Sequence, residues 1–583
     1  ETQRKLIDEL YLKSSKFVPK GTKESFVKLR EALNYYKYNF CSPSVFFSLI
    51  GDSGTEIEKA YREAQTKQTD KLKTYSDFMK EAVKDYDINS GAADNKKNVI
   101  GIELQGKKFD VTRNQLMSLY LLWNRPQGRQ HLETGGAAFV NRKGKNNIVQ
   151  TLKLDEQTFD SLMKHLSKKD IEVAKKVGDF LNSEVSEWGN EASMKLYGVR
   201  LFNEENYFPI SSTNDSLTTN FTNVDNYRTI QNLGITKAVN PNAKNAIKIM
   251  DMFDVADTHI QQMSAYSSYA PLNDSMERLI NMPNTKAAIE NYMGEEGEKY
   301  LYNFLKTVNL NGARDGKWDP VIDKFSGAYK KAAVSFNLST AAKQPLSIFR
   351  AAIIIDPKYL VKAKANLIGA GSNYKNSLAE MLNNSGIAKI KEQGYSDIGN
   401  PMRLRDTYFD ETLKNTNTKK VKYGIDKINE IGMKLAGKAD QVTWVRIWEA
   451  CKLQVQAEAK NTLTQSELLK KTSELFGEVI GKTQVVDSFL DSAPISNSAV
   501  FRLVAPFMNE PLKTTSTYIL AHENLIDAKG SGDKAAISKA KNYALRTAAA
   551  AVASNLILEP LISSVFSIIR DGEDDDLKSE TKQ

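Results

Sequence analysis

The stretch TEIEKAYREAQTKQTDKLKTYSDFMKEAVKDY, from Thr55 to Tyr86, decides the fold class of this chain. Its apolar side chains recur mostly at steps of three and four residues, which places them on one face of an α-helix. We expect one amphipathic helix of about 30 residues, about 45 Å long. Glu and Lys fill much of the remainder, and the apolar face consists of Ile57, Tyr61, Ala64, Leu72, Tyr75, Met79, Ala82, Val83 and Tyr86.

The segment before this helix, GDSGTE from Gly51, lacks the Gly-Lys-Ser/Thr ending of a phosphate-binding loop. We expect Ser53 or Thr55 to cap the helix instead, because hydroxyl side chains accept hydrogen bonds from the first free amides of a helix. A second long helix is expected from Lys420 to Ala459, where the same spacing of apolar residues returns.

The chain as a whole is expected to be mainly α: an elongated multi-helix assembly with one small β-hairpin. The hairpin is expected within Val99 to Val111, where two β-prone pieces flank Gln105 and Gly106. Seven regions follow: an N-terminal helical region with the long amphipathic helix (1–95), the hairpin (96–112), a helical region (113–210), a polar linker (211–245), a central helical region (246–415), a long-helix region (416–530), and an Ala-rich apolar helix with an acidic tail (531–583).

Composition narrows the class of protein. Of 583 residues, 41% are hydrophobic and 26% charged, as in ordinary globular proteins, and the net charge of +9 is not gathered into one block. A dedicated nucleic-acid domain would cluster its basic residues. The two cysteines, Cys41 and Cys451, cannot form a disulfide framework or a metal-binding pair. The N-terminus has no secretion signal and no initiator Met, which indicates a fragment or a processed chain.

The most apolar stretch is TAAAAVASNLILEPLISSVFSII, from Thr547 to Ile569. It approaches the roughly 20 apolar residues that a membrane-spanning helix needs, but Glu559 and Pro560 interrupt it, and an acidic residue at mid-bilayer is costly. We therefore expect a packed or interfacial helix, with conditional membrane contact left open. The candidate apolar stripe consists of Leu558, Ile562, Val565, Phe566 and Ile569.

Residues suited to catalysis are few. His131 and Glu133 form a His-x-Glu pair, but no Cys-x-x-Cys follows to complete a zinc site. Asp257 and His259 lie close together in a helical stretch without a further partner in sequence. No complete catalytic, metal-binding or cofactor-binding motif is present, so we predict no enzyme activity, catalytic residue, metal or cofactor.

Arginines beside aromatic residues raise the question of nucleic-acid binding. The stretch LLWNRPQGRQ carries Arg125 and Arg129, and Lys145 follows it. These three residues are the nucleic-acid candidates, because basic side chains next to rings can bind phosphates and stack on bases. Arginine stems also pack along apolar faces, so a purely structural role is the rival interpretation.

Four segments follow one another along the chain: RNQLMSLYLLWNRPQGRQHLETGGAAFV (Arg113–Val140), YGVRLFNEENYFPI (Tyr197–Ile210), FNLSTAAKQPLSIFRA (Phe336–Ala351) and APFMNEPLKTTSTY (Ala505–Tyr518). In this order they resemble blocks of the large polyvalent-protein-associated domains of tailed phages and prophages. The Ala-rich helix with its acidic tail completes the set, and the resemblance extends over roughly residues 30 to 576.

The resemblance implies a non-enzymatic virion-associated protein, packaged in the capsid or ejected with the genome. It implies a location in the capsid interior or tail and then in the host cell, and an oligomeric state in the particle. Other phage virion proteins are the implied partners, with genomic DNA and the host inner membrane as further candidates. Two alternatives stay open: a nucleic-acid-binding module of an injected protein, and an enzyme of unrecognised type built on Arg129, His131 and Glu133 or on Asp257 and His259.

Overall fold

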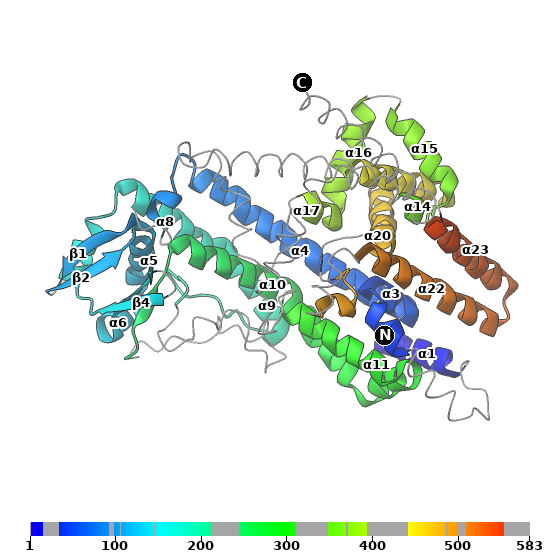
Figure 1. The fold of residues 1–583 in the computed structure, drawn as a ribbon, viewed down its shortest axis with the longest axis horizontal. Coiled ribbons are helices and arrows are strands. Elements are labelled where there is room, and N and C mark those ends of the chain that lie inside the picture. Colours follow the sequence, from blue (N-terminus) through cyan, green and yellow to red (C-terminus); the bar gives the residue numbers. More distant parts are fainter. Residues whose placement is uncertain are drawn as a thin grey trace, which may run out of the picture.

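The structure is a computed structural model, and the fold class is mainly α, as predicted. It describes residues 2–15, 34–92, 98–104, 106–143, 146–210, 244–310, 348–368, 371–392, 441–484, 488, 490–498 and 509–552. The elongated body is built along two long helices, α4 (Asp52–Ala82) and α10 (Met252–Asn281), which run beside each other (Figure 1).

The predicted helix over Thr55 to Tyr86 is confirmed as α4, and its buried stripe is the expected one. Its N-terminal cap differs from the prediction, because neither Ser53 nor Thr55 caps it. Instead, the backbone amide of Ser53 donates to the carboxylate of Glu9, at 3.1 Å from Oε2. A carboxylate at a helix N-terminus satisfies a free amide and complements the helix dipole, so α1 supplies the cap from a distance of 44 residues in sequence.

The α4–α10 interface is antiparallel and partly polar. The hydroxyl of Tyr61 lies 3.0 Å from Oδ1 of Asn273, whereas that of Tyr75 lies 2.8 Å from Oδ1 of Asp257. Because residue numbers rise along α4 as they fall along α10, the helices run in opposite directions. Burying polar pairs between two helices fixes their register, since a shift would leave each group without its partner.

One end of the body carries the sheets (Figure 1). The predicted hairpin is confirmed: β1 (Ile100–Leu104) pairs antiparallel with β2 (Lys107–Val111), and Gly106 in the turn has a φ of +69°. Five helices share the apolar core of this end with the hairpin: α5 (Arg113–Asn124), α6 (Pro126–Gly135), α7 (Glu156–Met163), α8 (Lys168–Phe180) and α9 (Ser186–Tyr197). A 3-10 turn, η1 (Asn89–Gly91), precedes β1. A π-helical turn, η3 (Leu181–Val185), connects α8 to α9.

A second sheet was not predicted. Strand β3 (Ala137–Lys143) pairs antiparallel with β4 (Asn146–Leu152) and parallel with β5 (Ile247–Ile249). Two regions expected to be helical therefore contain strands. The side chains of Ile247 and Ile249 are fully buried, so the sheet brings the start of α10 against the core of this end.

The middle and far end of the body are helical (Figure 1). The middle combines α1 (Thr2–Ser15), helical residues 34–40, α3 (Pro43–Ile50) and α11 (Pro283–Asn309) with parts of α4 and α10. The far end contains α14 (Ile348–Ala351), α15 (Pro357–Ile368), α16 (Gly371–Asn384), α17 (Gly386–Glu392), a helix over residues 441–458, α20 (Gln465–Thr483), a 3-10 turn η7 (Pro494–Asn497), α22 (Asn509–Ser531) and α23 (Lys534–Ala551).

The second predicted long helix is described only in part. Residues 441–458 are helical, whereas residues 420–440 lie outside the described residues. Most of the polar linker predicted over 211–245 also lies outside them. Trp444 and Trp448 from this helix pack on Phe476 of α20, with ring centroids 5.9 and 5.4 Å apart. They anchor a third apolar core, separate from those of the sheet end and the middle.

Candidate functional site

Arg125 lies between α5 and α6 and is buried at the centre of a charged contact. Its Nε donates to Oε1 of Glu204 at 2.6 Å, its Nη2 donates to the other carboxylate oxygen, and its Nη1 donates to the carbonyl of Phe208 at 2.7 Å. The guanidinium carbon stands 5.0 Å from the ring centroid of Tyr207. A planar fork that meets both oxygens of one carboxylate fixes orientation as well as position, so Arg125 fastens residues 204–208 against α5 and α6.

The same segment is held from its other side. The amide of Asn182 accepts from the backbone amide of Tyr207 at 2.5 Å and donates to its carbonyl at 3.1 Å. The ring of His259, from α10, lies 5.3 Å from the Tyr207 ring. Burial lowers the pKa of His259 to about 3, so this imidazole is neutral near pH 7. The contact therefore joins α5, the π-helical turn and α10.

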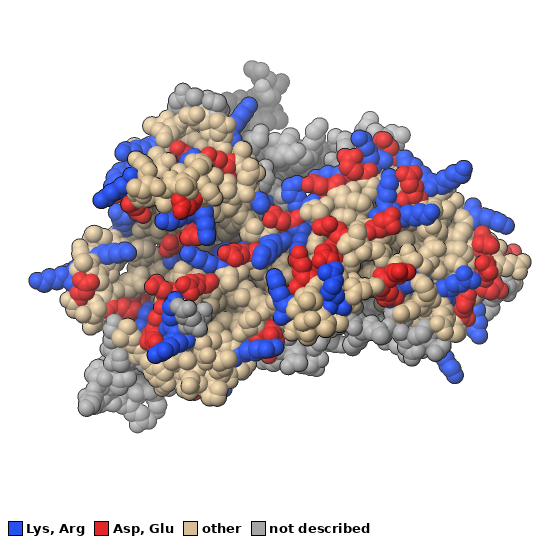
Figure 2. Space-filling view, turned by 180° about the vertical axis from the view of Figure 1, so that it is seen from behind, with Lys and Arg blue, Asp and Glu red and all other residues tan. Residues whose placement is uncertain are grey.

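The three nucleic-acid candidates, Arg125, Arg129 and Lys145, differ in exposure and in partners. Arg125 is only 2% exposed, and its guanidinium is engaged by Glu204 and Phe208. Its contact with nucleic acid stays a prediction. Arg129 is partly exposed, pairs with Glu133 at 3.0 Å and stands 4.6 Å from the ring centroid of Trp123. Lys145 lies outside the described residues. On the face drawn in Figure 2, Lys and Arg alternate with Asp and Glu and do not merge into one basic surface.

The residues of the enzyme alternative do not converge. His131 points inward and its Nε2 lies 2.7 Å from the carbonyl oxygen of Asn245, whereas Glu133 is on the surface with Arg129. Asp257 accepts the hydroxyl hydrogen of Tyr75, and His259 packs on Tyr207. Among the described residues, no group of His, Cys, Asp or Glu side chains is arranged to hold a metal ion.

A second charged contact is more deeply buried and joins distant parts of the sequence. We call Ser44, Glu58, Arg62, Asp491 and Lys513 the Asp491 network. Arg62, on α4, donates from Nη2 to Oδ1 of Asp491 at 2.6 Å and from Nη1 to Oδ2 at 2.9 Å. The Asp491 side chain is 0% exposed. This bidentate pair spans 429 positions of sequence.

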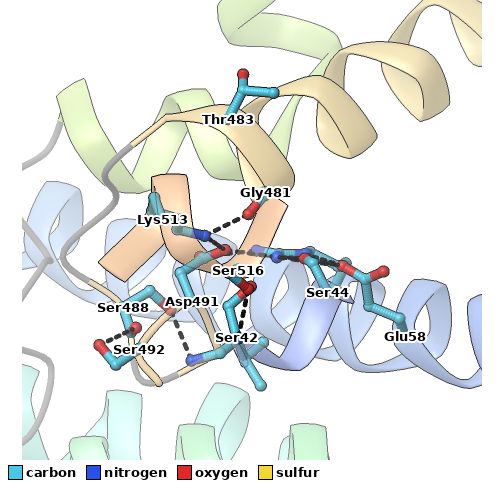
Figure 3. A network of polar contacts seen from close by, with 12 residues as sticks. Ser42, Ser44, Glu58, Gly481, Thr483, Ser488, Asp491, Ser492, Lys513 and Ser516 are labelled. Atoms are coloured by element: carbon cyan, nitrogen blue, oxygen red, sulfur yellow. Dashed lines mark hydrogen bonds and ion pairs between the residues drawn. The ribbon is translucent and has the colours of Figure 1, made fainter. Parts of the chain in front are cut away.

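Lys513, on α22, completes the Asp491 network. Its Nζ lies 3.5 Å from Oδ1 of Asp491 and donates to the carbonyl of Gly481 at the end of α20. Figure 3 shows Asp491 between Lys513 and the α4 side of the network. On that side, Nη2 of Arg62 also donates to Oγ of Ser44 at 2.8 Å, and Ser44 donates to Glu58. Two cations and two carboxylates thus share one buried site.

The electrostatics of the Asp491 network favour the charged forms of Arg62 and Asp491. Burial raises the pKa of Asp491, but the charges of Arg62 and Lys513 outweigh burial and hold that pKa below its ordinary value. Burial lowers the pKa of Lys513, in spite of the attraction of Asp491. Buried charges are tolerated only where they are paired and hydrogen-bonded, so the Asp491 network holds together only while α3, α4, α20 and α22 stay assembled.

Neutral hydrogen bonds extend this junction. The backbone amide of Ser42 donates to Oγ of Ser516 at 2.9 Å, and the amide of Gln65 donates to Oγ of Ser488 at 2.6 Å. Figure 3 places Ser42, Ser488 and Ser516 beside Asp491. Sequence reasoning missed the Asp491 network, because nothing local in the sequence links Arg62 to Asp491, 429 positions away. Lys513 does lie within one of the four resemblance segments, although no role was predicted for it.

Two further features singled out in the sequence are the cysteines and the C-terminal apolar stripe. Cys41 and Cys451 are free and buried in different cores, and burial raises the pKa of Cys41 to about 12. The apolar stripe of Leu558, Ile562, Val565, Phe566 and Ile569 lies outside the described residues. Within the part of the chain that is described, no helix has the length and apolar character needed to cross a membrane.

Comparison with known proteins finds no match to this chain among protein-family models, curated proteins or solved structures.

Proposed function

We propose that this chain is a virion-associated helical protein of a tailed phage or prophage, packaged in the capsid or ejected with the genome, and acting by assembly with other virion proteins. The proposal starts from the ordered resemblance of four segments to the polyvalent-protein-associated domains. One structural observation supports it most: several polar side chains of those segments hold helices together.

Three residues illustrate this use. Gln115 is fully buried, closes the capping box of α5 with Thr112, and donates to the carbonyl of Ile249 in β5 at 3.2 Å. Arg125 joins two of the resemblance segments to each other through Glu204 and Phe208. Lys513 joins a third segment to Asp491. These polar residues connect elements of the fold, as they would in a protein that acts by assembly with partners.

Passage with the genome is compatible with these connections. They are hydrogen bonds and ion pairs, and the two cysteines are free, so the described contacts can be broken and re-formed without redox chemistry. Helices refold quickly because most of their contacts are local. Contact with the host inner membrane would fall to the apolar stripe of Leu558 to Ile569, and it remains a prediction.

Mass spectrometry of purified particles of the encoding phage tests the proposal. We expect the chain at a fixed number of copies per particle, with peptides from its whole length. Detection only in infected cells, and never in particles, would overturn the virion assignment. Deleting residues 548–569 tests the membrane part separately: loss of liposome binding is expected, and unchanged liposome binding and infection would exclude it.

A nucleic-acid-binding function is the second candidate, and Arg129 is the observation that favours it. Its guanidinium is partly exposed and stands 4.6 Å from the ring centroid of the buried Trp123, so its outer side can meet a base or a phosphate. This function predicts DNA affinity that falls steeply with salt, and a shallower salt dependence after Arg129→Ala. Salt-independent or absent DNA binding would leave the assembly function alone.

A further inference from the structure

The C-terminal helices meet the rest of the molecule across a junction that is largely polar. We call the described residues within 2–310 the N-terminal body and those within 348–552 the C-terminal body. Helices α20 and α22 of the C-terminal body lie against α3, and α17 lies against α4 (Figure 1). The face of α22 that takes part has residues at steps of three and four, of which one is apolar: Lys513, Ser516, Leu520, Glu523 and Asp527.

The charges across the junction are arranged by sign. Lys389 of α17 lies 3.0 Å from Asp70 of α4, with the cation on the C-terminal body. Four other ion pairs have the opposite arrangement, with the cation on the N-terminal body: Lys13–Asp527 at 3.1 Å, Lys37–Glu523 at 3.0 Å, Lys59–Glu474 at 3.4 Å and Arg62–Asp491 at 2.6 Å. Complementary charges of this kind fix the register in which two surfaces meet.

The two bodies have separate apolar cores. The core of the C-terminal body does not merge with that of the middle. From the C-terminal body, the middle core receives the buried side chains of Leu490 and Leu520, and Ile519 and Tyr543 pack at its edge. Interfaces between domains of one chain are typically more polar than a core. Separation at the junction would therefore leave most of each core intact.

The two bodies approach each other most closely at two glycines of the C-terminal body. A Cβ atom at Gly481, near the end of α20, would stand 2.6 Å from Oγ of Ser44. A Cβ atom at Gly386, the first residue of α17, would overlap the side chain of Thr66 on α4. A longer side chain at either glycine would thus hold the two surfaces apart.

We propose that the molecule opens at this junction, so that the C-terminal body separates from the N-terminal body while both stay folded. Opening exposes charged and hydroxyl groups, which water hydrates, and comparatively little apolar surface. Partial opening of a protein takes place where buried apolar contacts are fewest. The Asp491 network and the ion pairs around it hold the closed form. Opening is a property of the chain alone and goes beyond the proposed function.

A side chain placed at the close approach tests the separation. Gly386→Gln should force the bodies apart, so that the radius of gyration from small-angle X-ray scattering rises while the helical circular dichroism signal stays unchanged. Gly477→Gln is the matched control and should change neither, because a Cβ atom at Gly477 of α20 has open space around it. Expansion with a matching loss of helix signal would overturn the proposal, as would an unchanged radius in Gly386→Gln.

A charge swap tests the closed form. Lys37→Glu places a second carboxylate beside Glu523, and Glu523→Lys places a second cation beside Lys37. Each single change should speed amide hydrogen exchange in α3 and α22 about tenfold or more, because like charges across an interface are costly. The double variant restores an opposite pair and should return exchange to within about threefold of the unchanged protein.

Two outcomes of the charge swap would overturn the proposal. One is exchange in the double variant that is as fast as in the single variants, since the pair would then not hold the junction closed. The other is an equal acceleration throughout both bodies in the single variants, which marks global unfolding and not separation. Both tests use the purified full chain, so neither result depends on whether phage particles contain it.

Discussion

Arg125 and Arg129 lie four residues apart in one sequence motif, yet the structure gives them different roles. Arg125 is buried with Glu204, whereas Arg129 is on the surface beside Glu133. Sequence reasoning singled out the motif but could not separate the two residues, because Glu204 and Phe208 are about 80 positions away. Spacing predicts which residues share a helix face, but it does not predict which distant segment covers that face.

Arg125→Ala should therefore destabilise the fold strongly. The change leaves the carbonyl of Phe208 without its donor and the carboxylate of Glu204 without its cation. Breaking a buried pair in this way costs about 3 kcal/mol or more, measured as the free energy of unfolding in urea. Arg129→Ala is the control and should cost less than about 1 kcal/mol, as for surface pairs. Equal effects of the two substitutions would contradict the structural role of Arg125.

His259 should make stability depend on pH. Its pKa is about 3 when folded and about 6.5 when unfolded, so below pH 6.5 the unfolded chain binds a proton that the folded chain does not. Stability is therefore complete above pH 6.5 and falls on acidification, by about 2 kcal/mol at pH 5. His259→Gln should remove this part of the slope, and the exposed His165→Gln should not. An unchanged slope in His259→Gln would disprove the assignment.

At the scale of elements, the regular helical pattern was predictable and the second sheet was not. Helix α4 follows from a period that persists over some 30 residues. Strands β3 and β4 are seven residues each, and β3 falls in a block expected to be helical. Their stability comes from pairing with each other and from β5, more than 90 positions later. Such tertiary pairing overrides weak local preference.

Two buried polar residues of α10, Asn273 and Ser268, should contribute unequally to the stability of the fold. Asn273 connects Tyr61 of α4 with Asn309 of α11, at 3.0 and 2.6 Å. Asn273→Ala leaves the Tyr61 hydroxyl buried without its acceptor and should cost about 2 kcal/mol or more. Ser268, also buried on α10, has no hydrogen-bond partner for its hydroxyl among the described residues.

Ser268→Ala is thus the matched control, because it removes a buried hydroxyl that contributes no hydrogen bond there. We expect a neutral or stabilising effect, within about 1 kcal/mol. Thermal unfolding followed by circular dichroism measures both variants. A destabilisation by Ser268→Ala as large as that by Asn273→Ala would show that packing, and not hydrogen bonding, holds these helices in register.

At the scale of the whole molecule, the Asp491 network ties the N-terminal helices to the C-terminal ones. The pKa of Asp491 lies below its ordinary value, so its contribution to stability is complete above about pH 4 and is lost only on stronger acidification. Only the Glu58–Arg62 pair, four residues apart on α4, could be expected from helical spacing. The other members come from α3, α22 and residue 491. Only the assembled fold brings them together.

Asp491→Asn should loosen this junction selectively. The change leaves Arg62 and Lys513 with Glu58 as their remaining carboxylate in the network, a buried charge imbalance that costs about 3 kcal/mol or more. Hydrogen exchange should speed up together in α3 and α22, while the β1–β2 end keeps its protection. Asp77→Asn, which breaks exposed pairs with Lys73 and Lys80, is the control and should change neither. Uniform loss of protection along the body would contradict a local junction.

The central claim is that this chain is an assembled component of phage particles. The most direct measurement is quantitative mass spectrometry of purified particles before and after genome release is triggered in vitro. We predict a fixed copy number in filled particles, with depletion from emptied ones if the chain is ejected and retention if it stays in the capsid. Absence of the chain from filled particles, at a sensitivity that detects one copy in each, would contradict the account.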